Sequence, residues 1–134
     1  ARQGSTRAPQ WTGGGVVFAP VPRDYSFKMN KKEKRAALKS VLTAKVQENK
    51  VVILDELKLD EVKTKAMVNV LNNVKAEKAI VVLKENDEKV MLSARNIADV
   101  QTSLVNTINV YDILKHNTLV MTKEAVQAIE EVYA

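Results

Sequence analysis

The chain has 134 residues, of which 46% are hydrophobic and 28% charged, and it carries a formal net charge of +5. That length suits a single domain. The sequence has no cysteine, which excludes a disulfide scaffold, a thiolate metal site and a cysteine nucleophile. It also has no apolar run near the roughly 18 residues that a membrane-spanning helix needs.

Residues 1–29, called the arm below, are predicted to be extended. All four glycines and all three prolines lie within residues 1–22, and these residues break helices and strands. Residues 1–35 hold eight of the 21 Lys and Arg but only two of the 16 Asp and Glu. We therefore expect a positive arm at 1–29 joined to a nearly neutral globular body at 30–134.

The first half of the body alternates between helix and strand. A capping-box pattern that begins at Asn30 predicts a helix over about 30–48, with Lys45 as a polar break in its apolar stripe. The short apolar run at 51–54 is typical of a buried parallel strand. An apolar stripe of helical spacing then predicts a helix over about 60–74.

The second half continues with shorter elements. After a buried strand at 79–83, we predict a helical turn capped by Ser93, a strand at 100–105, a short helix near 110–114, a strand at 118–121 and a final helix capped by Thr122. This order predicts an α/β fold with an open, mainly parallel sheet flanked by helices, in a Rossmann-like arrangement.

Sheets of this kind often bind nucleotides, but this sequence lacks the necessary turns. A phosphate is normally held by a glycine-rich turn that directly follows a strand. Here the strand ending at Leu54 is followed by Asp55 and Glu56, and the strand ending at Leu83 by an acidic loop at 84–88. The P-loop pattern is absent as well. We therefore expect no enzyme, no catalytic residue, no cofactor and no metal site.

Other residues that resemble catalytic or metal-binding groups have simpler interpretations. A lone histidine such as His116 is expected to be a polar cap or a surface group. The carboxylates that follow the strands lack a histidine or cysteine partner and the spacing of a calcium loop, so surface loops are expected there. Met67 and Met91 are assigned to the core.

The arm carries the side chains that point to a nucleic acid. Arginine forks match phosphate oxygens, glycines allow close backbone approach, and Trp11 can stack on an unpaired base. The alternative for Trp11 is a hydrophobic plug that docks the arm onto the body. The four cations within 31–35 have two interpretations. They form a solvated helix face, or they bind an external polyanion, which would neutralise charges that oppose the helix dipole. The predicted binding residues are Arg2, Arg7, Trp11, Gly13, Gly14, Gly15, Arg23, Lys28, Lys31, Lys32, Lys34 and Arg35.

The arm also closely resembles the bacterial large-subunit ribosomal protein four family. Its pattern A-R-x-G-S-x-x-x-P-x-W-x-G-G-G is matched by Ala1, Arg2, Gly4, Ser5, Pro9, Trp11, Gly13, Gly14 and Gly15. Further similar segments follow in order along the whole chain: PRDYS at 22–26, NKK at 30–32, ALKS at 37–40, KTK at 63–65, SARN at 93–96, NVYDIL at 109–114 and VMT at 120–122.

The resemblance implies a structural component of the large ribosomal subunit that binds and organises 23S-type rRNA. It implies early assembly, a loop directed toward the peptide exit tunnel, and a location in a cytoplasmic or organellar ribosome. The implied partners are large-subunit rRNA and neighbouring ribosomal proteins, with no membrane and no small-molecule substrate. Some family members repress their own operon, so binding to the protein's own mRNA leader is the alternative function.

In the family, a first strand and helix, the inbound half of the loop and its basic tip precede the position of Ala1. We therefore expect the arm to be the outbound limb of the loop, and the body to be incomplete at its N-terminal side. The resemblance supports rRNA contact along the arm and does not extend tunnel lining to this stretch. Ordering an extended arm costs about 1–2 kcal/mol per residue, so we expect it to be disordered without RNA.

Overall fold

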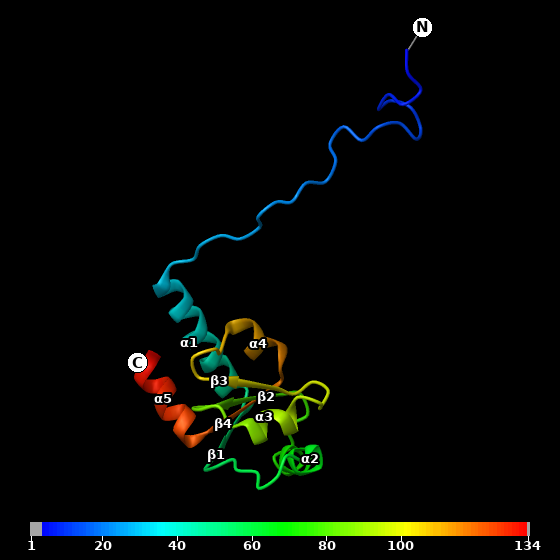
Figure 1. Ribbon diagram of the computed structural model, residues 1–134. Helices are drawn as coiled ribbons and strands as arrows, with labels where there is room; N and C mark the ends of the chain where they lie inside the picture. The colour runs from blue at the N-terminus through cyan, green and yellow to red at the C-terminus, as the bar shows by residue number, and fades with distance from the viewer. Residues whose placement is uncertain (1–3, 134) are drawn as a thin grey trace.

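The computed structural model describes residues 4–133 and joins a long irregular segment to a body of helices and strands (Figure 1). Residues 4–29 contain turns and extended backbone but no helix or strand. In Figure 1 they lead away from the body, beginning at the start of the first helix. Arg2 lies outside the described residues.

The body has its helices and strands in the predicted order. The elements are α1 (Lys31–Gln47), β1 (Val51–Leu54), α2 (Thr64–Asn73), β2 (Ala79–Leu83), α3 (Glu88–Ala94), β3 (Gln101–Leu104), α4 (Val110–Lys115), β4 (Thr118–Thr122) and α5 (Lys123–Tyr133). The four strands form one open, all-parallel sheet in the order β1-β4-β2-β3. The predicted α/β class and parallel sheet are therefore confirmed.

Helices cover both faces of the sheet, which gives the body two apolar cores (Figure 1). The side chains of the inner strand β2 alternate between them. Ala79, Val81 and Leu83 pack with α2 and α3, whereas Ile80 and Val82 pack with α1, α4 and α5. A parallel strand covered on both sides needs a continuous apolar run, and this is what residues 79–83 supply.

Two expectations about the segment before β3 are wrong. The helix expected from about residue 60 begins at Thr64. The loop before it is irregular because it buries Leu57 and Leu59 in the apolar core that α2 and α3 share with the sheet. Ser93 is not a cap but a fully buried residue inside α3, where its hydroxyl accepts a hydrogen bond from the backbone N–H of Lys63 at 3.1 Å. The same side chain thereby ties α3 to the start of α2.

The N-cap of α3 is Asp87, a residue expected only to solvate a surface loop. Its carboxylate accepts from the backbone N–H groups of Lys89 at 2.9 Å and Val90 at 3.4 Å. These groups would otherwise lack partners at the helix start. By contrast, the caps expected at Asn30 and Thr122 are confirmed.

Three single-residue expectations have different outcomes. Met67 is fully buried, as expected, whereas Met91 is 37% exposed on the outer side of α3 and is not a core residue. His116 follows α4 as its C-cap, so the capping role holds, but the side chain is buried rather than on the surface. Its Nδ1 lies 2.8 Å from the backbone oxygen of Asp112.

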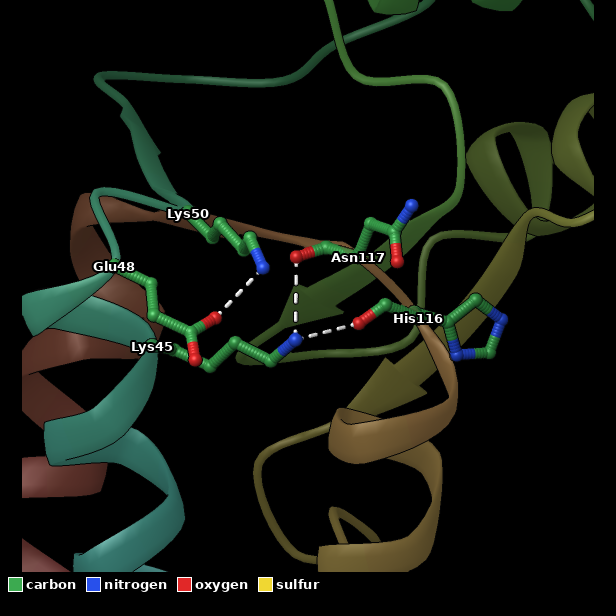
Figure 2. Close-up of polar contacts among 5 residues, drawn as sticks. All are labelled: Lys45, Glu48, Lys50, His116 and Asn117. Carbon is green, nitrogen blue, oxygen red and sulfur yellow. Dashed lines mark hydrogen bonds and ion pairs between the residues drawn. The ribbon is translucent and has the colours of Figure 1, made fainter.

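Lys45 is the least expected element of the core. Although it interrupts the apolar stripe of α1, it is only 7% exposed. Figure 2 shows its ammonium directed at the segment between α4 and β4, where Nζ donates to the backbone oxygens of His116 at 2.7 Å and Asn117 at 3.2 Å. Burial, with a smaller contribution from the charge of Lys50, lowers the pKa of Lys45. The contact fixes α1 to the segment that leads into β4, an inner strand of the sheet.

The body ends two helices with left-handed residues without using glycine. Asn49 after α1 and Lys75 after α2 both have φ of 55°. After α2, the N–H of Lys75 donates to the oxygen of Asn72 at 3.1 Å and the N–H of Ala76 to that of Leu71 at 3.0 Å. This pair of bonds is the Schellman motif, in which glycine is the usual left-handed residue.

Candidate nucleic-acid interface

The cations at the start of α1 are exposed to solvent. Residues 31–36 are all exposed, and Glu33 is the one acidic residue of the first turn. Its carboxylate is engaged in the capping box, where it accepts from the backbone N–H of Asn30 at 3.2 Å. Within residues 4–133, the ion pairs all lie between positions 48 and 63, so the structure pairs none of these cations with a carboxylate.

Residues 7–15, called the glycine loop below, are closed by their own backbone. The N–H of Gly15 donates to the oxygen of Arg7 at 2.9 Å. Inside that closure, the N–H of Trp11 donates to the oxygen of Ala8 at 3.0 Å, and the N–H of Gly14 to that of Trp11 at 2.9 Å. At this place the structure differs from a simply extended arm.

The glycines of this loop serve its own geometry. Gly13 has φ of +78°, a conformation that side chains with a β-carbon rarely adopt. A β-carbon on Gly14 would lie 2.0 Å from the oxygen of Ala8, so the loop has no room for one. At Gly15 the nearest atom would be the oxygen of Arg7 at 3.5 Å, an ordinary contact. We expected the glycines to let the backbone of the arm approach a partner closely. At Gly14 the backbone instead approaches another part of the arm, the oxygen of Ala8.

Trp11 is 47% exposed at the centre of the glycine loop. In Figure 1 this loop lies at the end of the arm far from the body, so the structure does not place it as a plug against the body. Arg7, Arg23 and Lys28 are exposed and distributed along the arm rather than gathered at one point. Their common feature is access to an extended partner.

Aromatic side chains of the arm were not among the predicted binding residues, apart from Trp11. Phe18 is 94%, Phe27 83% and Tyr25 76% exposed. The guanidinium carbon of Arg23 lies 4.2 Å from the centroid of the Tyr25 ring, a cation–π contact. The signal was present in the composition, since the arm holds four of the six aromatic residues of the chain.

Between Arg23 and Lys28, an acidic side chain of the arm bonds to the arm's own backbone. The carboxylate of Asp24 accepts from the backbone N–H of Ser26 at 2.8 Å, and this hydrogen bond lowers the pKa of Asp24. The single acidic residue of the arm therefore has a backbone partner of its own. It leaves the neighbouring cations available to an external anion.

The body has a hollow at the carboxyl ends of β1, β2 and β4, the place where such folds bind nucleotides. This crevice of about 730 Å³ is lined by six carboxylates but only three lysines, namely Asp55, Glu56, Glu85, Asp87, Glu88, Glu124, Lys58, Lys84 and Lys123. Among residues 4–133, no cluster of His, Cys, Asp and Glu could hold a metal ion. Each helix described is too short or too polar to traverse a bilayer.

These features define an α/β protein whose positive charge lies on an exposed arm and helix start rather than in a nucleotide crevice. The chain belongs to the ribosomal protein L4/L1 family, whose model matches residues 1–132. It is 69% identical over 134 residues to large ribosomal subunit protein uL4 of Agathobacter rectalis, and 63% identical to that of Lachnospira eligens. With the uL4 protein of Clostridium botulinum the identity is 55% over 134 residues. All of this chain is covered in each case, and it spans 65% of the length of these relatives.

Proposed function

We propose that this chain is a structural part of the large ribosomal subunit, in which the arm and the start of α1 bind and organise large-subunit rRNA. One observation carries the proposal: the cations and most of the aromatic side chains are exposed together on a segment that the body does not cover. Family membership supplies the ribosomal setting.

Electrostatics favour a polyanionic partner. Each phosphate that an Arg or Lys neutralises releases condensed counterions, which drives binding and makes it sensitive to salt. Cations in the first turn of a helix oppose the helix dipole, at a cost of about 0.3–1 kcal/mol each at low ionic strength. Phosphates placed beside Lys31 and Lys32 would remove that cost, and they would also meet the free N–H groups of the helix start.

The exposed aromatic residues favour RNA with accessible bases. Phe18, Tyr25 and Phe27 leave their rings in water in the isolated chain. RNA recognition typically uses such rings to stack on unpaired bases in loops, bulges and single strands. The body then serves as the anchor, and neighbouring large-subunit proteins are its expected partners. Early assembly and a direction toward the peptide exit tunnel form part of the same proposal.

The test is binding of the full chain to protein-free large-subunit rRNA, measured by filter binding across a range of salt concentrations. Arg23→Ala is expected to weaken binding and to reduce the salt slope by about one unit, as for one lost phosphate contact. Lys65→Ala, which removes an exposed cation from α2 on the body, is the matched control and should leave the slope unchanged. Equal slopes for all three proteins would refute the assignment of the arm.

The same assay addresses the alternative function. The protein's own mRNA leader, added as a competitor, should displace rRNA only at a higher concentration than unlabelled rRNA does. Tighter binding to the leader would instead identify an autoregulator that acts on its own operon.

A further inference from the structure

Within residues 4–29, the glycine loop (residues 7–15) is the one part of the arm that its own backbone closes. We propose that this loop is folded before RNA binds and holds Trp11 in place to stack on an unpaired RNA base. The inference rests on the proposed function and adds to it a class of target, an unpaired nucleotide, and a group of residues that position the contact.

The first support is the position of Trp11 within the loop. Its N–H donates to Ala8 and its oxygen accepts from Gly14, so hydrogen bonds hold its backbone on both sides. The residue remains 47% exposed, so part of its surface is covered and part is available to a ligand. Phe18 and Phe27, at 94% and 83% exposure, lack such support.

The second support is that the closed loop requires glycine at two positions, Gly13 for its backbone conformation and Gly14 for lack of space. Left-handed Gly13 and the 2.0 Å approach at Gly14 are requirements of the closed loop, and glycine satisfies both at no steric cost. If RNA alone ordered the arm, the arm's own backbone would not have to pack against the α-carbon of Gly14. Closure before binding also lowers the entropy that must be lost on association, which raises affinity.

The third support concerns the ligand. In a duplex the faces of the bases are covered by their neighbours, so an indole finds a free face only on an unpaired base. Arg7 belongs to the same loop and is exposed, so a phosphate beside that base has a cation within reach. A single nucleotide outside a helix therefore fits the loop better than a continuous duplex.

The experiment compares four substitutions at the three glycines in the full chain. Gly14→Ala places a methyl group against the oxygen of Ala8, whereas Gly15→Ala is the matched control because its methyl group meets ordinary contact distances. Gly13→Asn should be tolerated better than Gly13→Val, because Asn adopts left-handed backbone more readily than a β-branched residue. The urea midpoint of the body reports whether each variant still folds.

Two readouts are needed. Amide exchange in the free protein should show slowed exchange at Trp11, Gly14 and Gly15, lost in Gly14→Ala and retained in Gly15→Ala. Fluorescence of Trp11, the only tryptophan of the chain, should be quenched by single-stranded oligouridylate and not by a duplex of equal length. Gly14→Ala should weaken oligouridylate binding about 5- to 150-fold, the range expected for loss of one stacked base, with an unchanged salt slope.

The outcomes separate this inference from the proposed function. If Gly14→Ala binds like the wild type while Arg23→Ala binds weakly, the preformed loop is wrong and the rRNA-binding arm stands. If duplex and single strand quench Trp11 equally, the unpaired base is wrong. If the wild-type chain shows no salt-dependent binding to rRNA at all, the proposed function itself fails.

Discussion

Replacement of Lys45 by methionine tests how α1 is held to the body. Methionine preserves most of the volume and the apolar stem but removes the three donor hydrogens of the ammonium. The oxygens of His116 and Asn117, at 2.7 and 3.2 Å from Nζ, then lose their donor (Figure 2). Both follow α4, at whose C-terminal end carbonyls lack partners within the helix.

The size of the effect follows from the burial of these oxygens. A buried carbonyl left without a donor costs about 1–3 kcal/mol. The bond to His116 is buried, whereas that to Asn117 is partly buried, so water can replace part of the second contact. Methionine also avoids the desolvation of a charged amine, which offsets some of the loss. We therefore expect a net loss of about 2–3 kcal/mol in the free energy of unfolding, or roughly 8–20 °C in Tm for a body of this size.

The assay is urea unfolding followed by circular dichroism at 222 nm, because the only tryptophan lies in the arm and does not report on the body. Lys39→Met is the control, since it removes an exposed cation from the same helix and should change stability by less than about 0.5 kcal/mol. Equal midpoints for Lys45→Met and Lys39→Met would show that the two carbonyls do not depend on the ammonium.

Three further predictions use the same unfolding assay. Because burial lowers the pKa of Lys45 in the folded protein, the unfolded chain binds more protons than the folded protein between that lowered pKa and 10.5. The stability of the wild type relative to Lys45→Met should therefore rise with pH across this window. A stability difference that falls with pH there would contradict the direction of the pKa shift. Lys75→Gly should stabilise the body by about 0.5–1 kcal/mol, since glycine removes the cost of a β-carbon on left-handed backbone. Asn49→Gly should stabilise it less, because asparagine tolerates this backbone conformation. A loss of stability in Lys75→Gly would show that the left-handed backbone at Lys75 is not strained. Asp87→Ala should cost about 1 kcal/mol through the lost cap of α3, against little change for the exposed Glu85→Ala, and equal effects would refute the cap.

Elements with a strong local signal could be predicted from the sequence. The apolar run at 79–83 marked the inner strand, because a strand covered on both faces has no polar side to interrupt it. The caps at Asn30 and Thr122 were also predictable, since they depend on side chains within three residues of the helix start.

Two of the misjudged residues, Ser93 and Lys45, share a physical cause, which is a partner far away in the sequence. Ser93 looked like a cap when only the residues next to it in the sequence were considered. Its hydroxyl instead accepts a hydrogen bond from the N–H of Lys63, 30 positions earlier. Lys45 looked like a break in an apolar stripe, yet its partners lie 71 and 72 positions later. Single-sequence patterns contain no information about contacts at these separations.

The interface shows the same division. The exposure of the cations of the arm could be predicted from its composition, whereas their role as binding residues stays a prediction. The closure of the glycine loop depends on which carbonyl approaches Gly14, and that distance is not encoded in spacing. Phe18 and Phe27 are apolar residues of a type that is usually buried, yet their rings are exposed. Their role emerges only when the fold shows that the body offers them no core.

The charges of the molecule also constrain how it can sit on a polyanion. The crevice at the carboxyl ends of the strands is lined by six carboxylates and three lysines, so it repels phosphate at the site where this fold class usually binds it. The excess of cations over carboxylates lies instead on the arm and at the start of α1, where residues 1–35 hold eight Lys and Arg against two Asp and Glu. Like charges held together cost free energy, so an RNA that approaches the crevice is disfavoured relative to one that approaches the arm. In the proposed complex with rRNA, the acidic crevice and the basic arm therefore favour one orientation, with the arm against the RNA and the crevice directed away from it.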